Sequence, residues 1–450
     1  MSLRKQAASL AIMHVADVLQ PLLILPYAGR MLGANHFGQF AYAVAIGALA
    51  ATIVDYGFHW TAQRAAAAAR QEPAALASLF AEVIATKTML CLVVTAVGLA
   101  AADSFFAISK SMFLCTMLTS AGCILFPAWL FIALERAWQA AVAAVVARSL
   151  ALVCFLAMVT SPDQLKLAVA IQAAIPLVAG LISIPFVIPI GFAGFRSVTP
   201  SRVITQLRNG WRGFLYTLTE RATVTLPVPL VGHFAGYVAA GQYSVAEKFV
   251  SATRPIFRVM SETFLPRVAY YAQHDPAAGL ALIWNSLLTL AIGASLSLSL
   301  FFLAPYVIIA LFGEEFSAAI PIVRVMSIIP LLVNVNVCTS NLYMFNYGHE
   351  RAWARLTVAG LLVFLAVAFL LSPHVADPAI AVAIAVIAKE CVILVVSAGF
   401  FLAFGTAKKS ALPTRTVGNA EANGVAAGVI LAPSSSPNAL AGSKTLRRCR

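Results

Sequence analysis

The chain is poor in charged residues. Only 10% of its 450 residues are Asp, Glu, Lys or Arg, whereas 61% are hydrophobic and the mean hydropathy is +0.90. Soluble domains carry about 25% charged residues, so this composition excludes a water-soluble globular protein. Apolar stretches of roughly 20 residues, each long enough to cross a hydrocarbon core of about 30 Å, fill most of the chain. The sequence therefore predicts an all-α polytopic membrane protein.

The sequence also lacks the motifs of common catalytic and metal sites. Its seven cysteines are scattered and odd in number, which argues against a disulfide framework, and neither they nor the seven histidines have the spacing of metal ligands. It contains no phosphate-binding loop with its lysine and no metalloprotease motif. We expect no cofactor, no metal, no enzymatic activity and no ATP hydrolysis.

Acidic residues are outnumbered by basic ones, 17 against 30, and most basic residues stand beside apolar segments. This arrangement indicates membrane topology rather than nucleic-acid binding. With the N-terminus inside, only Arg30, Lys110 and Lys166 fall on the outer side, so both termini are predicted to be cytoplasmic. The apolar pattern predicts twelve spans, at residues 7–30, 37–59, 80–101, 109–132, 138–159, 167–192, 213–235, 237–260, 283–304, 320–344, 356–372 and 379–403.

A short pattern near the start of the chain recurs 203 positions later. The residues Pro26, Gly29, Gly33, Gly38, Gln39 and Phe40 are matched at this offset by Pro229, Gly232, Gly236, Gly241, Gln242 and Tyr243. Asp17 is matched by Glu220. The repeat indicates a duplicated half, and two similar membrane halves are typical of a transporter with its substrate path between them. We expect the glycines to form equivalent tight turns at the outer surface and to permit close helix approach.

The longest polar link between spans, from Gly194 to Arg212, carries four arginines and is the expected boundary between the halves. We predict a six-helix bundle over 1–193, a basic cytoplasmic linker over 194–212 and a second six-helix bundle over 213–404. Because both halves start from the same side, an axis along the membrane normal should relate them. Residues 405–450 have too little apolar surface to offset their ordering entropy, which predicts a disordered, basic cytoplasmic tail.

Seven segments follow one another along about 400 residues in the order found in a known family. They are LPYAGRMLGANHFGQFAYA (Leu25–Ala43), VDYGF (Val54–Phe58), FPAWLFIALER (Phe126–Arg136), GQYSVAEKF (Gly241–Phe249), FLPRVAYYA (Phe264–Ala272), GEEFSAAIPIVRV (Gly313–Val325) and NLYMFNYGHERAW (Asn341–Trp353). In these segments the chain resembles the bacterial polysaccharide flippases, the O-antigen and exopolysaccharide translocases of the multidrug/oligosaccharidyl-lipid/polysaccharide exporter superfamily.

The resemblance implies a fold and a function. The fold has about twelve transmembrane helices in two six-helix pseudo-symmetric bundles around a central cavity. The implied function is to move an undecaprenyl-pyrophosphate-linked oligosaccharide across the bacterial inner membrane, by alternating access through a cationic lumen, for O-antigen, capsule or exopolysaccharide synthesis. The expected partners are this lipid-linked oligosaccharide, membrane lipid, a polysaccharide polymerase and a chain-length regulator, with no nucleic acid.

Ionisable residues inside the spans are candidates for function. Each costs about 3 kcal/mol if it faces lipid, so most should face protein or a water-filled cavity. Neighbouring side chains on a helix point about 100° apart. We therefore expect Glu220 and Arg221, and likewise Glu247 and Lys248, to be poor partners for each other. The nine residues are Asp17, Lys87, Arg148, Glu220, Arg221, Glu247, Lys248, Lys389 and Glu390.

The eighth span carries the clearest polar pattern. Glu247, Ser251, Arg254 and Arg258 recur at helical spacing and predict one stripe that runs to the cytoplasmic end, with Lys248 on an adjacent face. Cations at this mouth would attract a pyrophosphate, whose oxygens arginine binds through paired hydrogen bonds. We therefore place Lys248, Arg254 and Arg258 among the substrate-binding candidates. Positive-inside anchoring explains the two arginines equally well.

Four further candidates have a structural alternative. Arg148 either meets a sugar-phosphate head group in the lumen or forms an ion pair with a carboxylate of another helix. Lys87 either binds substrate or extends its amine to the inner boundary. Asp17 and Glu220, at equivalent places in the two halves, either carry a coupling proton or balance a nearby lysine or arginine.

Two other functions fit a chain of this kind. A drug/cation antiporter of the same superfamily needs an anionic, aromatic-lined pocket, whereas the buried charges here are slightly cation-rich. A polysaccharide polymerase or ligase also has about a dozen spans, but such enzymes usually carry a long external loop, and every predicted external link here is short.

Overall fold

The protein is helical throughout its described part. The computed structural model describes residues 3–104, 106, 108–188, 194–195 and 198–405, and these contain no strand. The tail predicted over 405–450 lies outside the described residues, except Gly405. The first half comprises α1 (Leu3–Asp55), α2 (Phe58–Ala68), α3 (Pro73–Ala101), α4 (Lys110–Leu125), α5 (Ala128–Ala133), α6 (Ala137–Met158), the 3-10 helix η1 (Pro162–Gln164), α7 (Leu165–Ala173) and α8 (Ile175–Val187).

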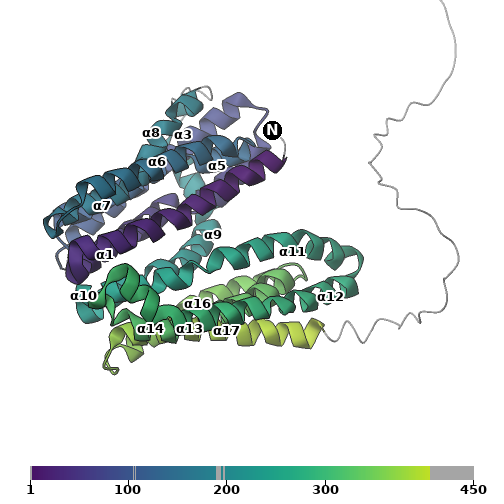
Figure 1. The fold of residues 1–450 in the computed structure, drawn as a ribbon. Coiled ribbons are helices and arrows are strands. Elements are labelled where there is room, and N and C mark those ends of the chain that lie inside the picture. The colour runs from purple at the N-terminus through teal and green to yellow at the C-terminus, as the bar shows by residue number, and fades with distance from the viewer. Residues whose placement is uncertain (1–2, 105, 107, 189–193, 196–197, 406–450) are drawn as a thin grey trace, which may run out of the picture. The chain divides into compact units, whose positions relative to one another are not determined.

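The second half begins with α9 (Pro200–Thr225). It continues with α10 (Pro227–Ser251), α11 (Arg254–His274), α12 (Pro276–Ser286), η4 (Leu287–Thr289), α13 (Leu290–Phe312), η5 (Glu314–Phe316), α14 (Ala319–Met326), α15 (Ile329–Asn336), the π-helix η6 (Val337–Met344), α16 (Glu350–Leu371), α17 (Pro378–Phe400) and the π-helix η7 (Phe401–Gly405). In Figure 1 the helices of the first half lie together, and so do α10 to α17, with α9 running between the two groups.

Ten helical segments among the described residues are long and apolar enough to cross a membrane. Two of them, Ala8–Ala68 and Pro200–His274, have 61 and 75 residues, several times the roughly 20 that one crossing needs. Each contains one glycine with a non-helical, positive φ, Gly33 at 70° and Gly236 at 80°. When each of these two segments is counted as a pair, the described chain has the twelve crossings that the sequence predicts.

The chain folds back on itself at Gly33 and at Gly236. Asp17 and Val44 line one cavity, although a straight helix would hold them about 40 Å apart. Similarly, a Cβ on Gly232 would lie 3.5 Å from that of Ala240. Because only glycine adopts these φ values without strain, the prediction that the repeated glycines form equivalent tight turns is confirmed. We call the end of the helices that carries Gly33 and Gly236 the turn end, and the other end the basic end.

The two halves meet at the turn end through α1 and α10, and the contact is symmetric. A Cβ on Gly38 would collide with the carbonyl group of Tyr237, and a Cβ on Gly241 would come within 3.2 Å of the Ala34 carbonyl oxygen. Ala34 and Tyr237 are themselves 203 residues apart, so each half offers the same surface to the other. Glycine at the repeated positions therefore sets how closely the halves approach.

Polar contacts reinforce this junction. The guanidinium of Arg30 donates hydrogen bonds to the carbonyl oxygens of Ala310 and Leu311, at the C-terminal end of α13. The backbone N–H of Ala34, which follows the first turn, donates to the Glu315 carboxylate at 3.2 Å. The amide of Gln242 donates to the Glu315 carbonyl oxygen at 2.7 Å. These bonds tie α1 and α10 to the C-terminal end of α13 and to the segment after it.

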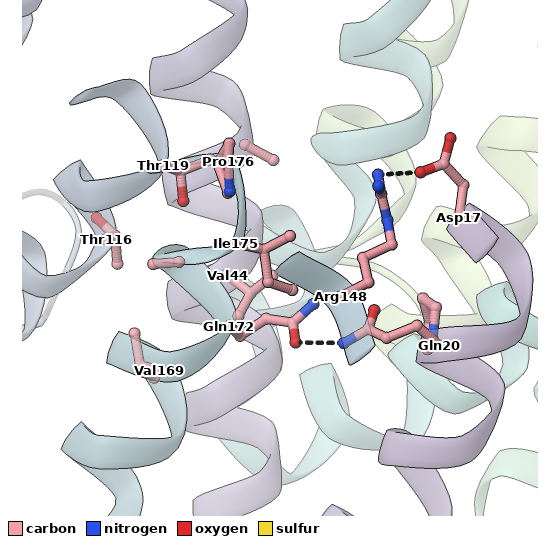
Figure 2. A pocket seen from close by; sticks show the side chains of 13 residues that line it. Asp17, Gln20, Val44, Thr116, Thr119, Arg148, Val169, Gln172, Ile175 and Pro176 are labelled. Atoms are coloured by element: carbon pink, nitrogen blue, oxygen red, sulfur yellow. Dashed lines mark hydrogen bonds and ion pairs between the residues drawn. The ribbon is translucent and has the colours of Figure 1, made fainter. Parts of the chain in front are cut away.

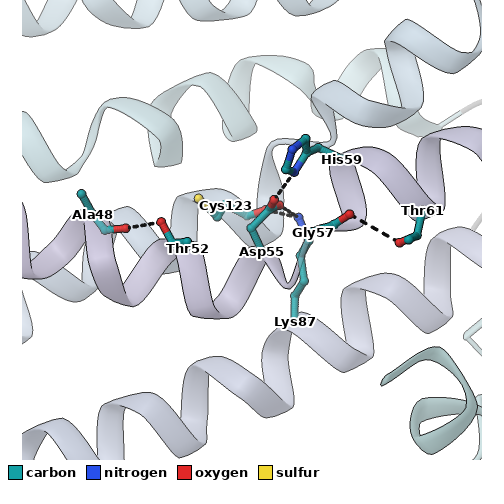
Figure 3. Close-up of polar contacts among 8 residues, drawn as sticks. All are labelled: Ala48, Thr52, Asp55, Gly57, His59, Thr61, Lys87 and Cys123. Carbon is teal, nitrogen blue, oxygen red and sulfur yellow. Dashed lines mark hydrogen bonds and ion pairs between the residues drawn. The ribbon is translucent and has the colours of Figure 1, made fainter. Parts of the chain in front are cut away.

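Near the basic end, one buried ion pair holds four helices together (Figure 3). The Nζ of Lys87 on α3 lies 2.7 Å from the Asp55 carboxylate at the end of α1, and 3.3 Å from the carbonyl oxygen of Cys123 on α4. The other carboxylate oxygen of Asp55 lies 2.8 Å from Nδ1 of His59 on α2. Lys87 is only 2% exposed. Since its charge has left water, the paired geometry is what makes its burial tolerable.

Most of the predicted linker is helix. α9 begins at Pro200, in the first turn, where a missing N–H costs no helical hydrogen bond. Its first turns pack on the first half, where Arg202 pairs with Glu82 at 2.9 Å, and the ring of Tyr56 stacks on Phe214 with centroids 4.5 Å apart. The link between the halves is therefore anchored on the first half before it enters the second.

The glycine contact yields a stability prediction. We expect Gly38→Ala to destabilise the protein by about 1–3 kcal/mol, because the new methyl group meets backbone atoms of α10 that cannot rotate away. The midpoint of thermal aggregation of detergent-purified protein measures this. Gly399→Ala on α17 is the matched control, since a Cβ there meets nothing within 4 Å. An unchanged midpoint for Gly38→Ala would show that the halves do not meet at this glycine.

The buried pair yields a second prediction. Lys87→Met leaves the Asp55 carboxylate without its lysine partner and should cost about 3–5 kcal/mol, whereas adding Asp55→Asn should recover part of the loss. The same thermal assay checks both. Lys110→Met removes an exposed pair with Asp103 at 3.3 Å and should change little. Equal effects at Lys87 and Lys110 would contradict the buried pairing.

Candidate functional site

A cavity of about 250 Å³ lies inside the first half (Figure 2). Its apolar walls come from valine, isoleucine, alanine and proline side chains. Six polar or charged residues also face it, which is many for the interior of an apolar bundle: Asp17, Gln20, Thr116, Thr119, Arg148 and Gln172. They stand on α1, α4, α6 and α7. We call the part of α1 before Gly33 its first arm, and the cavity forms where the other helices pack around this arm.

Asp17 and Arg148 form an ion pair in this cavity. Arg148 also donates to the carbonyl oxygen of Ala144 at 3.1 Å, and Nδ1 of His14 lies 3.8 Å from the Asp17 carboxylate. Neither member of the pair is fully buried. Arg148 therefore forms the ion pair with a carboxylate of another helix, and Asp17 balances a nearby arginine, as their structural alternatives state. The same two groups also line a cavity.

Two amides extend the polar wall. The Nε2 of Gln20 donates to Oε1 of Gln172 at 3.0 Å, which links the first arm of α1 to α7 (Figure 2). Gln20 is three residues from Asp17 and so lies on the same face of the helix. That spacing was a usable signal in the sequence, but Gln172 and the two threonines carry no comparable one.

The cationic candidates of the second half lie at the junction of α10 and α11. Arg258 is exposed and within electrostatic range of the Asp17 carboxylate, so a cation of the second half acts on the cavity of the first. Arg254 acts in the same way on the buried carboxylates of Glu247 and Glu390. Within the described chain, neither arginine has a carboxylate within 4.0 Å.

The helix predicted to carry one continuous stripe in the eighth span is interrupted after Ser251. The hydroxyl of Ser251 does donate to the Glu247 carboxylate, as their spacing requires. However, α10 ends at Ser251 and α11 begins at Arg254. Pro255 has no N–H to donate to the carbonyl oxygen four residues earlier, so the helix breaks there. The arginines therefore belong to a separate helix.

The expectation that adjacent charges are poor partners is wrong for Glu247 and Lys248, whereas Glu220 and Arg221 form no ion pair with each other in the described part of the chain. Lys248 Nζ lies 2.9 Å from the Glu247 carboxylate, and Lys389 Nζ lies 2.6 Å from that of Glu390. The long, flexible lysine stem bridges the 100° between neighbouring positions. Asn336 adds a 2.7 Å hydrogen bond to Glu390. Lys248 keeps 43% of its side chain exposed, so its ammonium remains accessible despite the pair.

Two candidates lie away from the cavity. Glu220 is exposed on α9, and no cation lies within 4.0 Å of it in the described part of the chain, so it does not reproduce the pairing of Asp17. The expectation that the Lys87 amine extends to the inner boundary is wrong, because its contacts with Asp55 and Cys123 hold the amine buried inside the first half. Asp55, which completes that pair, was not among the sequence candidates. No group of three potential metal ligands occurs among the described residues.

Comparison with known proteins agrees with this architecture. The family model described as "Polysaccharide biosynthesis protein" matches residues 3–271. A protein of Escherichia coli (strain K12) named "Putative O-antigen transporter" is 25% identical over 397 residues, which cover 87% of this chain and 95% of that protein.

Solved structures support the fold. An inward-facing multidrug resistance MATE family transporter of the MOP superfamily superposes with a TM-score of 0.65 at 14% identity, over 91% of this chain and 99% of that one. The lipid II flippase MurJ, in an inward closed conformation, gives 0.65 at 12% identity, over 86% and 87%. These relatives are named as transporters and a flippase, not as enzymes. The chain is thus a multi-pass membrane protein with a transporter fold, and it belongs to the polysaccharide biosynthesis protein family.

Proposed function

We propose that the protein is a flippase that moves an undecaprenyl-pyrophosphate-linked oligosaccharide repeat unit across the bacterial inner membrane. The observation that carries this proposal is the polar cavity around Asp17 and Arg148 within an apolar bundle. A lipid-linked sugar has a hydrophilic head that cannot cross hydrocarbon unaided, because each unsatisfied polar group there costs several kcal/mol. The cavity offers hydrogen-bonding groups to the head, while the lipid tail stays in the bilayer.

The charges around the cavity suit an anionic head group. Arg148 already neutralises Asp17, and Arg258 adds a further positive charge from the second half. Arg254 and the accessible ammonium of Lys248 extend this field along the second half. Guanidinium groups bind phosphate oxygens through paired hydrogen bonds. The pyrophosphate would be held at several moderate contacts, which also allows its release.

Transport would proceed by alternating access between two six-helix bundles, residues 1–193 and 213–404, with 194–212 as their link. The hydrogen bonds of Arg30, Ala34 and Gln242 lie at the turn end. With both termini cytoplasmic, as the distribution of Lys and Arg indicates, the turn end faces outward. Outward opening then requires these bonds and the glycine contact to separate. A polysaccharide polymerase and a chain-length regulator would receive the product.

The alternative of a drug/cation antiporter is less well supported by the cavity. Such a site needs an uncompensated negative charge for its cationic ligand, and here the Asp17 carboxylate is paired with Arg148. No aromatic ring lines this cavity. Both features favour a polar, anionic ligand over a lipophilic cation.

The proposal is tested in cells that lack the protein. We expect these cells to accumulate single lipid-linked repeat units on the inner leaflet, measured with radiolabelled sugar and a membrane-impermeant probe, and the wild-type chain to restore export. Unpolymerised units on the outer leaflet would instead indicate a polymerase, and retained ethidium-like dyes would indicate a drug antiporter. Either result would overturn the flippase assignment.

The same cells test the cavity residues. Arg148→Gln and Asp17→Asn should each lower export at least tenfold, because each leaves its partner's charge uncompensated in the cavity, while membrane insertion stays intact. Lys110→Gln, which breaks an exposed pair with Asp103 at 3.3 Å, is the matched control and should export normally. Full export by both cavity variants at normal protein level would remove the pair from the mechanism.

A further inference from the structure

Four aromatic rings form a row at the basic end that crosses from one half to the other. Trp60 on α2 lies 6.4 Å from Tyr216 on α9, Tyr216 lies 5.4 Å from Trp353 on α16, and Trp353 lies 5.6 Å from Phe345, all between ring centroids. We call Trp60, Tyr216, Trp353 and Phe345 the aromatic row. Its members come from three separate stretches of sequence, around Trp60, around Tyr216 and from Phe345 to Trp353, so only the packing of α9 between the halves aligns them.

The ends of the row are open. Trp60 is 54% exposed and Phe345 is 45% exposed. Aromatic rings also meet at the turn end, where Phe37 packs against Phe316. Both of these rings are fully buried, unlike the ends of the row. Rings that serve only to fill a core do not leave half of their surface uncovered, so the row has surface available for a ligand.

The surroundings of Trp60 are polar rather than lipid-like. A second cavity, of about 410 Å³, is lined by Trp60 together with Gln6, His59, Gln63, Arg64 and Glu135. Amides and charged groups around a single indole do not suit an acyl or prenyl chain. They suit a ligand that offers flat C–H surface and hydroxyl groups together, since specific pockets combine apolar area with a few placed polar groups.

We propose that the aromatic row and the cavity beside Trp60 form a saccharide-binding site, through which the sugar part of the substrate enters. The inference rests on the proposed flippase function. Pyranose rings present C–H groups on their faces, which the negative face of an aromatic ring attracts, and hydroxyl groups on their edges, which amides bind. Gln63 and Gln6 supply those amides beside Trp60.

The position of this site fits a path to the first cavity. Gln6 and Asp17 stand on the same arm of α1, eleven residues apart, which corresponds to about 16 Å along the helix axis. A head group of two or more sugars therefore reaches from the row toward Asp17 and Arg148. Because the row joins α2 of the first half to α16 of the second, a sugar bound along it contacts both halves at once.

A binding experiment with two probes tests the proposal. Purified protein in nanodiscs is titrated with the lipid-linked oligosaccharide extracted from cells that lack the protein, and separately with sugar-free undecaprenyl pyrophosphate. We expect Trp60→Leu and Trp353→Leu each to weaken binding of the sugar-bearing lipid about tenfold and to leave binding of the sugar-free lipid unchanged. Trp60→Tyr, which keeps an aromatic face, should retain most of the affinity.

Trp138→Leu is the matched control, since Trp138 is also 40% exposed and packs edge-on against Phe186 outside the row. Size-exclusion profiles confirm folding of each variant, and the two leucine variants lie on different halves, so one remains informative if the other misfolds. Equal weakening of both probes, or normal binding by the leucine variants, would overturn the saccharide site alone. Failure of the wild-type protein to bind either lipid would overturn the flippase proposal itself.

Discussion

The structure depends on the close contact of α1 with α10 at the turn end. The backbones of two helices come into contact only where no Cβ lies between them. Gly38 on α1 and Gly241 on α10 both lack a Cβ at this contact. The chain reverses at Gly33 and Gly236, a few residues before this contact, so turn and contact form one unit in each half. Hydrogen bonds from Arg30 and Gln242 hold the end of α13 and the segment after it at the same junction.

The apolar interior of the membrane restricts where charged side chains can lie. A charge that has left water is stable only beside an opposite charge or in a cavity, and the chain uses both solutions. Lys87 and Asp55 are shielded at the meeting point of four helices, which suits a fixed structural joint. Asp17 and Arg148 are paired as well, but on the wall of a cavity with amides beside them, where a ligand can exchange with the existing contacts.

The two proposed binding regions differ in chemistry, and together they match an amphiphilic substrate. The aromatic row offers ring faces and the cavity beside Trp60 offers amides for sugars, whereas the cavity of Asp17 and Arg148 lies within the field of Arg258 and suits phosphate. The two regions share the first arm of α1. Because the row spans both halves, a rocking motion of the halves would alter the distances between its rings. The first cavity is lined by the first half alone, so the same motion would leave it intact.

Composition and the repeat were enough to predict the fold, because hydropathy alone decides which segments cross a bilayer and because positive φ at Gly33 and Gly236 is a local property of glycine. Residue spacing also predicted that Ser251 would face Glu247. The partners of the charges could not be predicted in this way. Which helix faces Asp17, that Asp55 meets Lys87, and that Lys248 turns to its own neighbour Glu247 depend on how helices distant in sequence pack. Likewise, Trp60, Tyr216 and Trp353 share no sequence spacing, and only tertiary packing brings their rings into one row.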